Sequence, residues 1–443
     1  MPLRYRRTYS WELLAWGVLP VMLGMLEGGV VGITAKKSFS GHVDADLLNL
    51  VIGLLTGLPA MANLTSFAWA AGAHGRNKIR FVVTLQIITV ISIASVCLAA
   101  PTAWGFLLFA VSVAIGRIAW AGVVTIRTTI WAANYPRSDR GRVAGAFATM
   151  QALCLAGITF LTGMLLDENP DAYRWVFPLA AAVGGLGVFF YSRIRIRGHR
   201  RMLRLEREAS RDSRQPRPSI NPLGILGVLH RDRGFGAFMA CLFLIGTGNI
   251  MVTAPLVIIL DEQFKLDYVA AISILTSIPI LMMPFSIPIW SRLLDRVHVV
   301  RFRAIHSWIF ICSNMILFGS VLTTWLPGIW IASIIRGLGF GGGVLAWNLG
   351  HHDFAAPEHS SQYMGVHVTL TGIRGLLAPL LGISAYEILI AQGHPTGGGV
   401  FLVASLLGVL GATGFLLLGK RFASPPDQAT GPTTTTQRKP PGA

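Results

Sequence analysis

The chain has 443 residues, of which 53% are hydrophobic and only 13% charged, and its formal net charge is +17. Soluble globular proteins carry about 25% charged residues, so this composition excludes an ordinary soluble domain and indicates a protein embedded in a membrane. A net positive charge of this size suggests nucleic-acid binding in a soluble chain. In a membrane protein, the positions of basic residues instead indicate which loops are cytoplasmic.

Twelve apolar stretches follow one another along the chain, and each is long enough to cross a bilayer. A helix needs about 20 apolar residues to span roughly 30 Å of hydrocarbon, and it satisfies its own backbone polar groups, as lipid requires. We therefore predict an all-α integral membrane fold of twelve spans, at 11–34, 46–71, 80–100, 103–133, 143–166, 174–192, 235–260, 268–291, 303–324, 328–350, 363–390 and 397–419.

A basic segment divides these spans into two groups of six. It holds twelve arginines between residues 193 and 233. We predict an N-terminal six-helix bundle at 1–192, a cytoplasmic basic linker at 193–233, a C-terminal six-helix bundle at 234–422 and a disordered, Pro- and Thr-rich tail at 423–443. The first half of the linker is either an amphipathic helix on the membrane surface or a solvated connection.

The positions of the basic residues predict the orientation of the chain. Outside the spans, only Lys36, Lys37, Arg174 and Lys265 fall on the side opposite the N-terminus. Because basic residues in short loops stay cytoplasmic, we predict that both termini are cytoplasmic, in the plasma membrane or, in a bacterium, the inner membrane. Anionic lipid headgroups are the expected neighbours of the inner-face arginines, and no nucleic-acid partner is expected.

The two groups of spans repeat several features. Gly116-Arg117 lies in the fourth span, before the basic loop 135–142, and Arg336-Gly337 lies in the tenth span, before the loop 356–361. Such corresponding features predict duplicated bundles around a central site. A chance similarity between two glycine-rich apolar segments is the alternative.

The loops after the second and eighth spans carry a further pattern. They read Gly72-Ala73-His74-Gly75-Arg76-Asn77-Lys78 and Ser291-Arg292-Leu293-Leu294-Asp295-Arg296-Val297-His298. With the twelve-span topology, these sequences resemble the motif G-x-L-a-D-R-x-G-R-K of the major facilitator superfamily of secondary transporters, and the resemblance covers residues 11–420.

The resemblance implies a cytoplasmic gate in which an acidic side chain faces a helix N-terminus and a neighbouring arginine. In the second half Asp295 can play that part, whereas in the first half Gly72 stands at the acidic position and cannot. The residues assigned to the gate are Gly75, Arg76, Lys78, Asp295, Arg296 and Arg140.

Glu27 is the most informative ionisable residue within the predicted spans. Charges inside a membrane are costly and usually functional, and Glu27 lies about 14 residues into the first span, roughly 21 Å above its inner end. We predict a protonatable carboxyl group in the outer half of a central cavity, exchanging a proton against substrate. A carboxylate of the outer vestibule, or one that only supports packing, is the alternative.

Arg117 resembles the arginine of the superfamily's R-x-x-x-G motif, which is associated with proton-coupled exporters, although Ala121 occupies the glycine position. Counting along straight helices separates Glu27 and Arg117 by about 10 Å in height, so the sequence does not predict a direct ion pair between them. A structural role, in which Arg117 bonds to backbone carbonyl groups, is equally compatible with the sequence.

Three further arginines, Arg127, Arg336 and Arg374, lie within the predicted spans. Arg336 is the second-half counterpart of Arg117, and the glycine run that follows it favours close helix packing over a phosphate-binding loop. Arg374 lies near mid-membrane before Pro379, which frees a carbonyl group one turn earlier that Arg374 can satisfy. Three deep cations against one deep carboxylate favour an anionic substrate, unless the arginines are buried in helix interfaces.

We therefore predict a proton-coupled secondary transporter that moves a small organic solute by alternating access, with Glu27, Arg117, Arg336 and Arg374 along the substrate and proton pathway. Uptake of an organic anion and efflux of drug-like amphipathic compounds both remain open. A non-transporting receptor or scaffold with the same fold is the alternative. We expect no enzymatic activity or cofactor, because we find no carboxylate or histidine sets of adjacent helices at catalytic spacing. We expect no metal ion, because the adjacent residues His351-His352-Asp353 do not share a helix face.

Overall fold

The fold is described from a computed structural model, which covers residues 3–211, 224–355 and 360–420. Within these ranges the regular structure is helical, apart from an isolated bridge between Ser40 and Val43. Twelve helical segments are long and apolar enough to cross a membrane, which confirms the predicted all-α, twelve-span fold. The predicted tail, 423–443, lies outside the described residues.

The first six spans form the N-terminal bundle. Two of them are single helices, and the others consist of two or three consecutive helices. In chain order the six spans are α1 (Leu3–Gly24) with α2 (Gly28–Phe39); α3 (Ala45–Met61) with η1 (Ala62–Thr65) and α4 (Ser66–Ala73); α5 (Lys78–Ala94) with η2 (Ser95–Leu98); α6 (Ala103–Asn134); α7 (Arg137–Glu168); and η3 (Pro170–Ala172) with α8 (Tyr173–Ser192).

The second six spans form the C-terminal bundle: α11 (Arg233–Met251) and α12 (Thr253–Glu262); α13 (Tyr268–Ile272), the π-helical η4 (Ser273–Ser277) and α14 (Ile278–Leu294); α15 (Val299–Leu322); α16 (Leu326–Leu349) and η5 (Gly350–Asp353); α17 (Ser360–Ala391); α18 (Gly399–Gly419). The linker contains α9 (His199–Arg211), which lies in its first half, and α10 (Gly224–Arg231).

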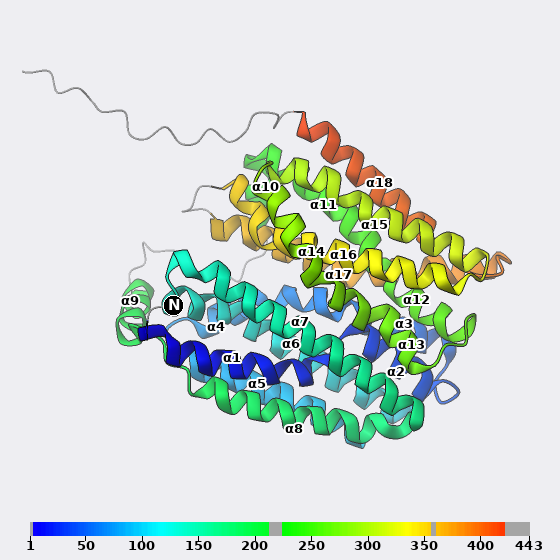
Figure 1. The fold of residues 1–443 in the computed structure, drawn as a ribbon, viewed down its shortest axis with the longest axis horizontal. Coiled ribbons are helices and arrows are strands. Elements are labelled where there is room, and N and C mark those ends of the chain that lie inside the picture. Colours follow the sequence, from blue (N-terminus) through cyan, green and yellow to red (C-terminus); the bar gives the residue numbers. More distant parts are fainter. Residues whose placement is uncertain (1–2, 212–223, 356–359, 421–443) are drawn as a thin grey trace, which may run out of the picture.

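The two bundles lie side by side (Figure 1). The end of the molecule that carries α9 and the described chain ends, at the left of the figure, is called the linker face. The opposite end, where α2 turns into α3 and α12 into α13, is called the distal face.

The first and seventh spans are interrupted at corresponding places. In the first span the N–H groups of Met25, Leu26 and Glu27 bond to carbonyl groups three residues back, a tighter turn than the α-helix makes. In the seventh span Pro255 has no N–H to donate to the Met251 carbonyl group, and α11 ends there. Interrupted helices near mid-membrane are characteristic of transporter sites.

Small residues bring the second and eleventh spans into close contact. A side-chain Cβ atom at Gly57 would lie 2.4 Å from the Gly375 carbonyl oxygen, and one at Gly375 would lie 2.2 Å from the Met61 backbone nitrogen. The glycine run after Arg336 is packed in the same way, since a Cβ atom at Gly337 would lie 2.7 Å from Pro279 Cα. The predicted close packing of that run is confirmed.

We expect Gly57→Ala to lower the free energy of unfolding by about 1–3 kcal/mol, because overpacking forces helices apart. The matched control is Gly157→Ala, where nothing lies within 4 Å of the added Cβ atom, and helix propensity should raise stability by up to about 1 kcal/mol. Thermal unfolding of the purified protein in detergent measures both changes. Equal shifts in the two variants would contradict this account of the interface.

Candidate functional site

The interruption of the first span positions Glu27. The residue precedes the first residue of α2 with extended backbone angles (φ −72°, ψ 135°), and its side chain is 23% exposed. Its Oε1 atom lies 3.7 Å from Arg117 Nη1 of α6. The sequence did not predict this ion pair, because counting along straight helices ignores both the interruption at 25–27 and the reach of two long side chains.

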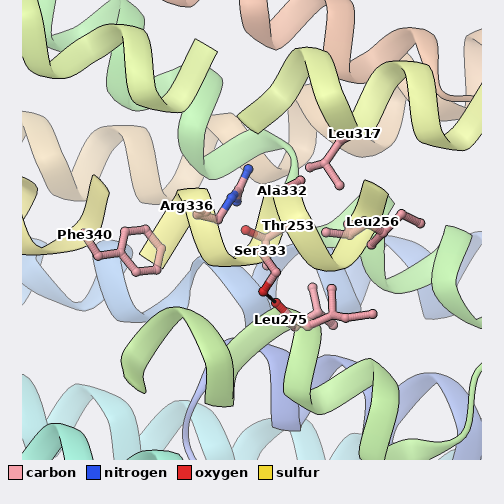
Figure 2. Close-up of a pocket in the computed structure, with 10 residues that line it drawn as sticks. Thr253, Leu256, Leu275, Leu317, Ala332, Ser333, Arg336 and Phe340 are labelled. Atoms are coloured by element: carbon pink, nitrogen blue, oxygen red, sulfur yellow. Dashed lines mark hydrogen bonds between the residues drawn. The ribbon is translucent and has the colours of Figure 1, made fainter. Parts of the chain in front are cut away.

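The C-terminal bundle holds a second polar group at the corresponding place. Arg336 Nη2 donates to Asn314 Oδ1 at 2.9 Å, and Arg336 lines a cavity of about 50 Å³ with residues of α12, η4, α15 and α16. Figure 2 shows the apolar side chains Leu256, Leu275 and Phe340 around this arginine. The cavity thus combines an apolar wall with one guanidinium group.

The π-helical turn η4 connects this cavity to the first span. Ser333 Oγ donates to the Ile274 carbonyl oxygen at 2.6 Å, which ties η4 to α16 (Figure 2). On the other side, a Cβ atom at Gly29 would lie 2.7 Å from Leu275 Cβ, so the start of α2 rests on a residue that lines the cavity. Glu27 and the cavity therefore adjoin the same contact between the bundles.

Arg374 is turned into its own bundle. Its Nη1 atom donates to the Leu242 carbonyl oxygen of α11 at 2.6 Å, and its Nη2 atom donates to Thr371 Oγ1 at 2.8 Å. The guanidinium group passes over Gly246, where a Cβ atom would overlap it. The expectation that Arg374 bonds to the carbonyl group freed by Pro379 was wrong, because α11 offers Arg374 a carbonyl group across the helix interface.

Two ion pairs join the bundles at the distal face. Lys36 Nζ lies 2.7 Å from Glu262 Oε1, and Lys37 Nζ lies 3.1 Å from Asp261 Oδ1. The Lys36 side chain is only 4% exposed, so its pair is less screened by solvent than ordinary surface pairs. Sequence reasoning treated both lysines as loop charges, although opposite charges at the ends of the corresponding first and seventh spans were a usable signal.

A third polar contact at the distal face uses backbone groups. Asp167, at the end of α7, accepts hydrogen bonds from the N–H groups of Tyr268 at 2.5 Å and of Val269 at 2.9 Å. A carboxylate at these unpaired N–H groups is stabilised by the partial positive charge of the helix start. We refer to Lys36–Glu262, Lys37–Asp261 and Asp167 with its two partners as the distal latch. It closes the distal face.

On the linker face, part of the predicted gate binds the linker helix. The Gly75 N–H group and Lys78 Nζ each contact Glu206 Oε2 of α9 at 2.7 Å. Glu206 thus provides a carboxylate next to a motif in which Gly72 replaces the acidic residue. Arg76 is exposed.

The second-half gate residues are arranged differently. Asp295 and Arg296 are exposed at the end of α14, and within the described ranges no hydrogen bond or ion pair of their side chains is found. The side chain of Arg140 lies outside the described part of the chain. Asp353, from the His-His-Asp sequence, accepts the Val299 N–H group at 2.7 Å and so caps α15.

The structure also reveals a buried carboxylate that the sequence analysis did not single out. Glu12 is fully buried and accepts hydrogen bonds from Tyr135 OH, at 2.5 Å, and from Trp131 Nε1. Arg127 is stacked between Trp16 and Trp131, 4.5 Å from each ring centre. Burial, together with the Glu12 charge, raises the pKa of Tyr135, so the phenol keeps its proton and remains a donor.

Glu12 changes the charge balance expected for the spans. The sequence analysis counted Glu27 as the one deep carboxylate and did not count Arg303, the first residue of the predicted span 303–324, among the deep cations, whereas Arg303 lies within α15 and is 7% exposed. The error at Arg303 has a simple cause, because α15 begins four residues before the predicted span. Glu12 was not singled out because it lies at the edge of the predicted span 11–34, next to apolar residues.

Comparison with known proteins gives concordant results. A family model described as Major Facilitator Superfamily matches residues 12–379. The POT family transporter PepTSo superposes with a TM-score of 0.70 at 11% identity, covering 94% of this chain and 98% of its own. A D-xylose-proton symporter gives 0.70 at 14% identity (93% and 97%), and the nucleoside transporter NupG gives 0.65 at 12% (93% and 99%). A search of curated protein sequences finds no match.

We expect Glu206→Gln to release α9 from the N-terminal bundle, because the neutral amide loses the charge that holds Lys78. A charge-assisted hydrogen bond contributes about 1.5–3 kcal/mol, so amide hydrogen exchange in α9 should accelerate about ten-fold or more. The control is Glu208→Gln on the same helix, whose carboxylate forms only an exposed pair with Arg204. Similar exchange in both variants would show that Glu206 does not hold the helix.

Proposed function

The chain belongs to the major facilitator superfamily, and from that premise we propose that it moves a small organic solute across the membrane by proton-coupled alternating access. The observation that carries this proposal is the Glu27–Arg117 ion pair at the interruption of the first span. It places a titratable carboxylate beside a potential anion-binding group, next to the contact between the bundles.

The pair supplies a mechanism for coupling. While Glu27 is ionised, its carboxylate occupies Arg117. Protonation of Glu27 removes this charge and leaves the guanidinium group free to bind a carboxylate or phosphate of the solute. When the proton leaves, the ion pair re-forms and displaces the solute. The partial exposure of the Glu27 side chain, 23%, gives protons access to it.

The surroundings favour a solute with an apolar body and a negative group. Arg336 lies in a cavity whose walls are largely leucine, isoleucine and phenylalanine. Arg374 adds positive charge from within the C-terminal bundle, where it bonds to Leu242 rather than facing the space between the bundles. Arginine binds carboxylate and phosphate groups in a bidentate manner. The proteins of similar fold are a POT family transporter, a D-xylose-proton symporter and a nucleoside transporter. The fold is therefore compatible with several solute classes.

Alternating access requires the distal latch to open. The latch holds α2 against α12 through Lys36 and Glu262, and α7 against α13 through Asp167. Because the first span is interrupted at 25–27, α2 can change its angle to α1 when the latch breaks. Transport in this proposal is a cycle in which the latch breaks, the solute exchanges at the distal face, and the latch re-forms.

We expect Glu27→Gln to abolish flux driven by a pH gradient in proteoliposomes, with at least a ten-fold loss, while solute exchange without a gradient persists. The assay would screen chemically diverse anions, cations and neutral compounds. Asp171→Asn, which removes an exposed carboxylate at the distal face, is the control. Unchanged gradient-driven flux in Glu27→Gln would remove this residue as the coupling site. A folded protein that transports no compound would favour a receptor or scaffold.

We expect the distal latch to respond to charge reversal. Lys37→Glu should favour the state open at the distal face by repelling Asp261, and adding Asp261→Lys should restore closure with the charges exchanged. Spin labels at His42 and Gln392, both exposed at the distal face, report the separation of the bundles by electron paramagnetic resonance. If the double variant resembles Lys37→Glu rather than the unmodified protein, the pair does not act as a latch.

A further inference from the structure

Two arginines and two histidines are buried inside the C-terminal bundle, within range of one another's charges. Arg303 and His306 are on α15, and His367 and Arg374 are on α17; their exposed fractions are 7%, 1%, 2% and 5%. The charge of Arg303 acts on His306 and His367, and that of Arg374 acts on Arg303 and His367. These four residues are called the cationic cluster.

Several nitrogen atoms of the cationic cluster have no hydrogen-bond partner. Arg374 bonds through both Nη atoms, but its Nε atom is buried without a partner. Arg303 Nε and His367 Nε2 are also buried and unpartnered. Within the described ranges the Arg303 guanidinium group makes no hydrogen bond. Unpartnered buried polar groups are few in native proteins, and here three belong to one cluster.

Among the described residues, the cationic cluster also lacks a counter-charge. No ion pair found in the described part of the chain involves Arg303 or Arg374, and the charges that act on the two histidines are those of Arg303, Arg374 and His351, all basic residues. Arginine does not deprotonate in proteins, so this charge persists. An uncompensated buried charge is strongly destabilising.

The other arginines inside the spans show how this protein compensates such charges. Arg117 has Glu27, Arg336 has Asn314, and Arg127 lies between Trp16 and Trp131. Arg127 Nε is also unpartnered, but the charge of Glu12 acts on Arg127, whereas the charge that acts on Arg303 is that of a second arginine, Arg374. The missing partner is therefore an anion from solution.

We propose that the cationic cluster binds a small inorganic anion, of the size of chloride, between the Nε atoms of Arg303 and Arg374 and the Nε2 atom of His367. The site lies within one bundle rather than between the two, so it does not need to open when the bundles move. The anion neutralises part of the positive charge behind the substrate pathway and stabilises the C-terminal bundle. It is distinct from the transported solute.

The test compares thermal unfolding of the purified protein in chloride and in gluconate at equal ionic strength. The unmodified protein should unfold several degrees higher in chloride, because a ligand that binds only the folded state stabilises it. Arg303→Gln should lose this difference and, in gluconate, should be at least as stable as the unmodified protein, since it removes an unpaired charge and no hydrogen bond.

Arg127→Gln is the matched control, because it also removes an arginine from within the spans, but one that is stacked between two indole rings and has the Glu12 charge nearby. It should lose stability equally in both salts. If the unmodified protein unfolds at the same temperature in chloride and gluconate, or if Arg303→Gln keeps the full chloride effect, the proposal is overturned.

Radioactive chloride binding to the unmodified protein keeps the proposal testable if Arg303→Gln does not fold. Saturable binding of about one ion per chain, displaced by bromide and not by gluconate, is expected. Absence of saturable binding would overturn the proposal. Displacement by a compound that the protein transports would assign the cationic cluster to the solute pathway instead. Neither outcome depends on proton coupling, so this proposal and the transport mechanism can fail separately.

Discussion

A charged side chain between membrane-spanning helices must find its partner there, because neither lipid nor bulk water can solvate it. In this protein, the first span carries three charged residues that meet this requirement. Glu12 binds Tyr135 and Trp131 of its own bundle, Glu27 meets Arg117 at the interruption of the span, and Lys36 reaches Glu262 of the opposite bundle. The first span therefore carries charge contacts near its start, at its interruption and near its end, and the last of them crosses between the bundles.

The interruption at 25–27 divides this span according to its partners. The α1 segment is held by aromatic and polar groups of the N-terminal bundle, whereas α2 contacts both bundles: its Phe39 packs on Phe106 and Tyr173, its Gly29 lies against η4, and its Lys36 pairs with Glu262 of α12. Glu27 stands at the joint between the two segments. In the proposed mechanism, a change in its protonation acts where the chain passes from a segment held in one bundle to a segment that contacts both.

Much of the fold was predictable, because the bilayer imposes a length and a composition on each span. The residues of the site were recognisable for a similar reason, since Glu27, Arg117 and Arg336 are conspicuous in apolar sequence. Their geometry was not. The Glu27–Arg117 contact depends on a helix interruption that counting ignores, and Arg374 turned toward the Leu242 carbonyl group rather than the one that Pro379 frees. The Glu206 contact joins residues more than a hundred positions apart.

The sequence by itself determined that this chain is a twelve-span membrane protein of two similar halves, and it pointed to several of the ionisable residues within the spans. Hydropathy and composition are local properties, which each segment shows by itself. Only the tertiary structure decided which charges meet: that Glu206 stands beside the motif lacking an acid, that Lys36 and Asp167 join the bundles at the distal face, and that the charge of Arg374 acts on Arg303, with no ion pair to either among the described residues. Partnership across helices depends on rotation, tilt and interruption of the helices, and these are set by packing between segments distant in the chain.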